Sequence, residues 1–144
     1  MGNRNDIRWE QRFANFGKAL LQLHKALDKK DLSDLEEEGM IKRFEYTYEL
    51  AWKTMQDLLK ERGYPDIVGP RPVIEQCLED GIITNGEVWM RMIKSRNLTA
   101  HVYDEKTVEE IAEIIRTEYF DVFKSFYRKL DQEQSGPQNN LFEK

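Results

Sequence analysis

Residues 88–103 carry the side chains whose types and spacing could do chemistry. No aspartate or glutamate falls in this stretch, but four cationic or titratable residues do: Arg91, Lys94, Arg96 and His101. The chain has 27 acidic residues among 144, so a stretch of this length would be expected to hold about three. Residues 11–27 are acid-free as well. The basic stretch is therefore either a chance patch or a site for an anionic ligand.

Arg96 falls on a face that is otherwise apolar. Trp89, Ile93 and Arg96 are separated by four and three residues, which places them on one side of a helix. A guanidinium there needs an anionic or hydrogen-bonding partner, for example a glutamate of the preceding long helix. His101 follows five residues later, about 140° around a continuous helix. Arg96 and His101 can meet at one ligand only if the helix ends between them, or if a second copy supplies one of them.

The elements that must position these residues are all helices. Apolar residues recur at helical spacing through most of the chain, and no strand pattern is present. Ser33 and Glu36 form a capping box at the start of the second helix, and Thr107 and Glu110 are predicted to form another at the last one. The expected helices cover residues 6–29, 33–62, 72–80 and 85–99, and a final one runs from about 104–107 to 130. Residues 1–131 are predicted to form one domain, and 132–144 a flexible tail.

Composition excludes several classes of protein. The net charge is −5, which argues against a nucleic-acid binder that uses its whole surface. Two histidines and one cysteine are too few for a structural zinc cluster or an internal disulfide. No apolar run is long enough for a membrane span or a signal peptide. We therefore expect a soluble, cytoplasmic, all-α protein: an antiparallel bundle of four to five helices.

The motif in residues 96–103, RNLTAHVY, resembles a known signature. It matches R-x-x-x-x-H-x-Y, which is typical of HEPN-domain proteins of the HepT type. Further segments resemble the nucleotidyltransferase substrate-binding branch of that superfamily: 43–54 (RFEYTYELAWKT), 73–75 (VIE), 86–89 (GEVW) and 103–107 (YDEKT). The resemblance covers about residues 6–130, nearly the whole chain that is expected to be ordered.

This resemblance implies a HEPN-like homodimer in which the two motifs face each other. It implies a toxin of the endoribonuclease type, which needs no metal or other cofactor and is neutralised by a minimal nucleotidyltransferase. Arg96 and His101 would be the catalytic pair, with Asn97 as the accompanying polar residue. Tyr103 matches a tyrosine that the partner can adenylylate. A dimer would bring together two acid-free segments, so Arg91 and Lys94 become candidate contacts to an RNA substrate.

Two other hypotheses remain open from the sequence. In one, the protein is a non-catalytic, substrate-binding subunit of a two-component nucleotidyltransferase. In the other, it is a dimeric scaffold in which Arg96 is only a buried ion-pair residue. The nuclease hypothesis is chemically consistent, because a histidine near neutral pKa can act as acid or base and an arginine can hold phosphate oxygens.

Overall fold

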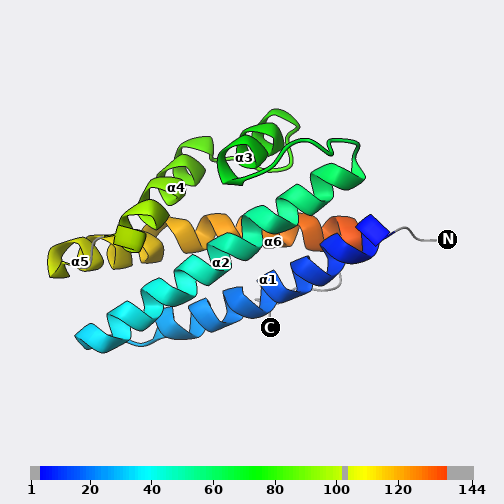
Figure 1. The fold of residues 1–144 in the computed structure, drawn as a ribbon. Helices are drawn as coiled ribbons and strands as arrows, with labels where there is room; N and C mark the ends of the chain where they lie inside the picture. Colours follow the sequence, from blue (N-terminus) through cyan, green and yellow to red (C-terminus); the bar gives the residue numbers. More distant parts are fainter. Residues whose placement is uncertain (1–3, 102–103, 136–144) are drawn as a thin grey trace.

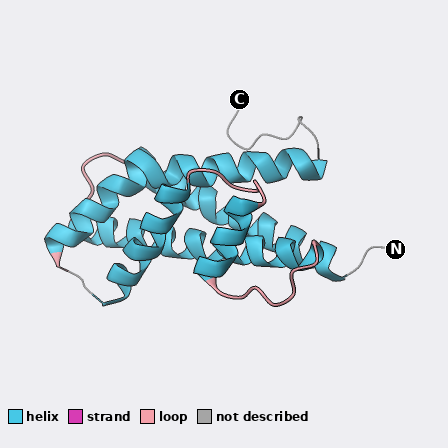
Figure 2. Cartoon of the chain, turned by 90° about the horizontal axis from the view of Figure 1, so that it is seen from above, coloured by secondary structure: helices cyan, strands magenta, loops and turns pink. Residues whose placement is uncertain are grey.

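The chain folds into a bundle of helices. The computed structural model describes residues 4–101 and 104–135, with side chains for residues 8–100 and 104–133. In chain order the elements are α1 (Arg4–Asp28), α2 (Asp34–Glu61), α3 (Pro70–Glu79), α4 (Gly86–His101), α5 (Glu105–Ile114), the π-helix η1 (Ile115–Tyr119) and α6 (Phe120–Ser135). The last three follow one another without a break (Figure 1). Within the described ranges there are helices and loops but no strand, which confirms the predicted all-α class (Figure 2).

Helices α1 and α2 form a long antiparallel hairpin, and the predicted capping box starts its second arm. The Ser33 hydroxyl accepts a hydrogen bond from the Glu36 amide at 3.2 Å, and the Glu36 carboxylate accepts one from the Ser33 amide at 2.9 Å. Lys29, and after it Ser33, lower the pKa of Glu36 to about 2. The carboxylate is therefore ionised at neutral pH and closes the turn between the two arms.

An aromatic core holds α4 against the rest of the bundle. Trp89 of α4 is buried and meets the rings of Phe123 and Phe126 edge-on, at centroid distances of 5.9 and 6.0 Å. Phe44 of α2 belongs to the same core, and its ring stacks on the ring of Tyr119 with centroids 5.3 Å apart. Such contacts fix the rotation of α4 about its own axis. The residue two turns beyond Trp89 on the same face is Arg96, which consequently faces α2.

The last long helix begins within the predicted range, residues 104–107, but its capping residues differ from the prediction. The N-cap is Asp104, whose carboxylate accepts hydrogen bonds from the Thr107 amide at 2.8 Å and from its hydroxyl at 2.9 Å. The prediction of a capping box at Thr107 and Glu110 is therefore wrong, because Thr107 already lies in the first turn. Asp104, three residues earlier and in extended conformation, occupies the N-cap position instead.

Two other helix ends extend beyond their predicted limits. α4 continues through His101 rather than ending near Thr99, and α6 runs to Ser135, past the predicted domain limit at Asp131. Residues 136–144 of the expected tail lie outside the described residues. None of the helices in residues 4–101 and 104–135 is long and apolar enough to span a membrane.

Candidate active site on helix α4

Arg96 lies on the face of α4 that packs against α2, where two carboxylates meet it. Its Nη1 is 3.5 Å from Glu45 Oε2, and its Nε is 3.9 Å from Glu49 Oε2. The guanidinium side chain keeps 31 % of its surface exposed. The ion pair with a glutamate of the second helix, one of the partners that the sequence suggests, is thus present. We call Arg96, Glu45, Glu49 and Thr99 the Arg96 cluster.

Glu45 is the buried member of the Arg96 cluster. Only 8 % of the residue is exposed, and its Oε2 accepts hydrogen bonds from the Thr99 hydroxyl and from Arg96. Its other oxygen lies 3.5 Å from Lys42 Nζ. Because a buried carboxylate is stable only with donors around it, Glu45 ties the last turns of α4 to the middle of α2.

Glu49 is the half-buried carboxylate of the cluster, and it lies farther from Arg96 than Glu45 does. Its carboxylate accepts a hydrogen bond from Trp52 Nε1 at 3.3 Å, and Lys53 approaches to 3.9 Å. Charge-assisted hydrogen bonds between arginine and carboxylate are typically about 2.7–2.9 Å long, shorter than either contact of Arg96. Among the described residues, the buried Nε of Arg96 has no hydrogen-bond partner. Because that nitrogen is buried, another anion, such as a phosphate, would have to meet the exposed part of the Arg96 side chain.

A buried hydrogen bond next to Arg96 joins α4 to the π-helix. Ser95 Oγ and Tyr119 Oη are 2.7 Å apart, and Tyr119 is fully buried. Burial raises the pKa of Tyr119, so its hydroxyl stays protonated at neutral pH. π-Helical turns are rare and often occur near functional sites. Here the π-helix η1 contributes Tyr119, the residue that holds α4 one position before Arg96.

His101 is the last residue of α4, and the helix is continuous from Arg96 to it. Positions 96 and 101 are consequently about 140° apart around the axis and about 7.5 Å apart along it. Asn97 is exposed, about 100° from Arg96. Tyr103 lies outside the described residues, as does the side chain of His101. Within one chain, α4 does not place positions 96 and 101 on the same face.

Arg91 and Lys94 point away from Arg96. They are exposed, at about 140° and 160° from it around α4. The guanidinium of Arg91 forms an ion pair with Glu118 of η1. The two candidate substrate contacts thus do not belong to the face that carries the Arg96 cluster.

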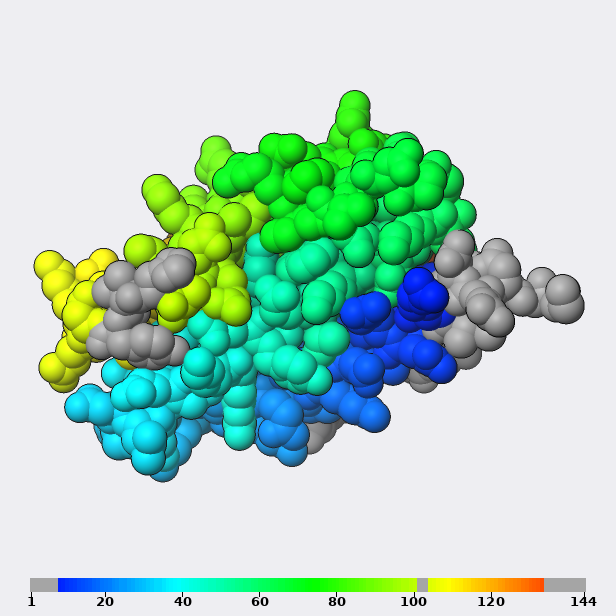
Figure 3. All heavy atoms as spheres, viewed as in Figure 1, coloured from blue at the N-terminus to red at the C-terminus, as the bar shows by residue number. Residues whose placement is uncertain are grey.

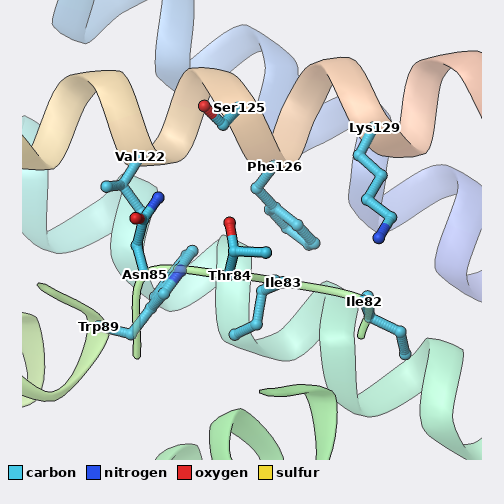
Figure 4. Close-up of a pocket in the computed structure, with 9 residues that line it drawn as sticks. All are labelled: Ile82, Ile83, Thr84, Asn85, Trp89, Val122, Ser125, Phe126 and Lys129. Atoms are coloured by element: carbon cyan, nitrogen blue, oxygen red, sulfur yellow. The ribbon is translucent and has the colours of Figure 1, made fainter. Parts of the chain in front are cut away.

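Two other residues whose side chains could take part in chemistry, His24 and Cys77, have structural roles. His24 stacks on Phe120 with ring centroids 5.3 Å apart, and Cys77 is fully buried, which raises the pKa of its thiol to about 12. Among the described residues, no group of three histidine, cysteine or acidic side chains could hold a metal ion. The hollow between residues 82–85 and α6 measures about 40 Å³, room for about one water molecule (Figure 4).

Sequence reasoning did not identify Glu45, Glu49 and Thr99 individually. A signal for the glutamates does exist, since Lys42, Glu45, Glu49 and Lys53 recur at spacings of three and four along α2. This pattern is also typical of a solvated helix face with ion pairs, so it does not by itself point to a site. Thr99 carries no signal, because its role depends on how α4 packs on α2.

An antiparallel all-α bundle with an R-x-x-x-x-H motif at the end of its fourth helix defines a HEPN-like protein of the HepT type. Comparison with known families agrees with this class. The sequence model of the family described as "Nucleotidyltransferase substrate binding protein like" matches residues 11–132, and the chain belongs to this family.

Two relatives are informative. The chain is 32 % identical over 81 residues to a Haemophilus influenzae protein named "Probable ribonuclease HepT". That match covers 53 % of this chain and 56 % of the relative, so the chain spans about half the length of this curated relative. A crystal structure of a protein from Thermus thermophilus has a TM-score of 0.73 and 29 % identity, covering 80 % of this chain and 98 % of the other.

Replacing Glu45 and Glu49 separately tests which of the two carboxylates contributes more to the free energy of unfolding. Glu45→Ala should lower the free energy of unfolding by about 2–3 kcal/mol, because Arg96 and Thr99 lose a buried acceptor. Glu49→Ala, at the more exposed position, should cost less than about 1 kcal/mol. Urea unfolding of both variants measures the difference. Equal losses would show that Glu45 does not anchor α4.

Proposed function

We propose that this protein is a metal-independent endoribonuclease of the HepT type, in which Arg96 and His101 act at a dimeric site. The observation that carries the proposal is the state of Arg96. Its side chain is 31 % exposed and makes only long contacts to two carboxylates, five positions before His101 at the end of the same helix. The name of the Haemophilus influenzae relative, a probable ribonuclease, supports the same activity.

The chemistry requires three groups. A base takes the proton from the 2′-hydroxyl, the 2′-oxygen attacks the adjacent phosphorus, and an acid protonates the 5′-oxygen as its bond to phosphorus breaks. The products are a 2′,3′-cyclic phosphate and a 5′-hydroxyl. Imidazole suits both proton transfers because its pKa lies near 6.5. Arg96 would bind the non-bridging oxygens, where negative charge accumulates, and Asn97 would contact the substrate or orient a catalytic group.

The geometry of α4 supports the proposal of a dimeric site. Since positions 96 and 101 lie on different faces of one continuous helix, a single chain does not direct both at one phosphate. Two-fold symmetry allows Arg96 of one protomer and His101 of the other to converge, or two imidazoles to share the acid and base roles.

The partner is a minimal nucleotidyltransferase that acts as an antitoxin. The description of the family, which refers to a nucleotidyltransferase, supports this partner. Transfer of an adenylyl group to Tyr103 would add bulk and negative charge two positions from His101. That charge would repel an RNA phosphate and block the site.

A second function is compatible with the same family: a substrate-binding subunit of the nucleotidyltransferase without chemistry of its own. The ion pairs of Arg96 favour this second function, because Glu45 and Glu49 already contact part of the guanidinium. The two functions differ in whether RNA is cut.

The nuclease proposal predicts the effect of removing the imidazole. His101→Ala should lower the rate of RNA cleavage in EDTA by about 10²–10⁴-fold, because the acid–base group is lost. The matched control is His24→Gln at the other histidine, which should leave cleavage unchanged. Gel analysis of labelled RNA gives the rates, and thermal melting verifies that both variants fold. If several RNAs remain intact with the wild-type protein, the binding-subunit function is correct instead.

Mixing experiments test whether one site uses the imidazoles of both chains. Wild-type and His101→Ala chains are co-expressed in equal amounts with different tags, so that mixed dimers form. If each site needs both imidazoles, only pure wild-type dimers are active, and cleavage falls to about one quarter. If each His101 acts independently, cleavage falls to about one half, and the shared acid–base role is wrong.

Modification of Tyr103 is tested with the partner and ATP. The peptide that contains Tyr103 should gain the mass of an adenylyl group, and RNA cleavage should stop as the modified fraction rises. Tyr103→Phe should remain unmodified and active under the same conditions. An unchanged peptide mass, measured by mass spectrometry, would contradict this mode of neutralisation.

A further inference from the structure

The second acid-free stretch of the sequence, residues 11–27, forms one wall of a groove. This groove between α1 and α2 has a volume of about 320 Å³. Its lining residues are Asn15, Lys18, Ala19, Gln22, Lys42, Arg43 and Tyr46. Three of these are cations and none is acidic. We call it the α1–α2 groove.

Two of the lining side chains are arranged in a way that suits a ligand. Arg43 is fixed across the groove, because its Nη1 donates a 2.7 Å hydrogen bond to the backbone oxygen of Gln22. Tyr46 keeps 60 % of its surface exposed, an unusual exposure for a large aromatic side chain. A fixed cation beside an exposed ring offers both charge and a stacking surface.

The α1–α2 groove and the Arg96 cluster lie on two different sides of α2. Arg43 and Glu45 are two residues apart, so they are about 160° apart around the helix. Lys42 and Tyr46 fall between them on the exposed side, and Lys42 Nζ lies 3.5 Å from Glu45 Oε1. The space-filling view shows α2 running between α1 and α4 on one face of the molecule (Figure 3). A flexible chain bound at Arg96 could cross α2 at these two residues and enter the groove.

We propose that the α1–α2 groove binds the single-stranded RNA that flanks the cleaved bond. Lys18, Lys42 and Arg43 bind its phosphates, and one base stacks on Tyr46. The inference rests on the proposed nuclease function and extends it from the scissile phosphate to the path of the substrate. It assigns to the first two helices a role in substrate binding that is separate from catalysis.

Charge and shape favour a single strand over other anions. Proteins that bind single-stranded nucleic acid combine a positive groove with aromatic platforms, and the α1–α2 groove has both. A free phosphate would use the cations and leave Tyr46 without a role. The chain as a whole is acidic, so a polyanion gains most by binding where acids are absent.

The test measures RNA binding separately from cleavage. A fluorescein-labelled single-stranded RNA is titrated with the full-length His101→Ala protein, and anisotropy gives the affinity at several salt concentrations. Adding Lys18→Glu should weaken binding by about tenfold and reduce the slope of log K against log salt by about 0.7, the value for one phosphate contact. Lys18 is suitable because it lies on α1, away from the Arg96 cluster. The matched control is Arg8→Glu, an exposed residue of the same helix that does not line the groove.

Tyr46 gives an independent readout. Tyr46→Ala should weaken RNA binding about tenfold with no change in salt slope, because stacking releases no counterions. Tyr46→Phe should retain the affinity. Melting temperatures verify that all variants are folded.

The possible outcomes distinguish failure of the groove proposal from failure of the proposed nuclease function. If Lys18→Glu and Tyr46→Ala bind RNA as well as the Arg8→Glu control does, or if the parent binds no RNA, the groove proposal is wrong. If these variants instead bind RNA normally and lose the nucleotidyltransferase, the groove is a protein-docking site, and the proposal also fails. If RNA binding depends on the groove but wild-type protein cuts no RNA, the groove proposal stands and the nuclease function fails.

Discussion

The requirement of the Glu45 carboxylate for hydrogen-bond donors is the constraint on which the candidate site depends. Glu45 is almost buried between α2 and α4, and Thr99 and Arg96 of α4 supply donors to it. Leaving such a carboxylate without donors would cost several kcal/mol, so α4 cannot rotate or slide freely on α2. The packing of Trp89 on Phe123 and the Ser95–Tyr119 hydrogen bond add contacts that hold the same helix against α6 and η1. Arg96 is therefore held in place although its own contacts are long.

That rigidity has a consequence for catalysis. A side chain that is fixed by the surrounding bundle, but incompletely neutralised, is preorganised to receive an anion with little rearrangement. The same rigid helix separates positions 96 and 101 by about 140°. Stability of α4 and convergence of the two residues within one chain are in conflict, and the two-fold symmetry proposed above would remove the conflict. In the proposed homodimer, the second copy would complete the site.

The sequence predicted the helices and the partner of Arg96 better than it predicted local details. The Ser33–Glu36 capping box and the apolar face that ends in Arg96 depend on spacing within one helix, which a single sequence displays. The cap at Asp104 was missed because two adjacent sites compete and only extended backbone at Asp104 decides between them. The π-helix and the identity of Glu45 depend on packing between helices, which periodicity does not encode.

The distribution of charge bears on the proposal that this acidic chain binds RNA. Acidic residues gather where α2 begins beside α5, around a hollow lined by Asp34, Glu37, Glu38, Glu105 and Val108. Burial and, after it, Glu109 raise the pKa of Glu37 there, a sign of crowded negative charge. This acidic end would repel a polyanion, whereas the acid-free stretches line the α1–α2 groove and form most of α4. If RNA binds as proposed, repulsion at this end and attraction at the α1–α2 groove would direct the strand toward the groove and away from the start of α2. The net charge of −5 would therefore restrict where the proposed RNA binding occurs without excluding it.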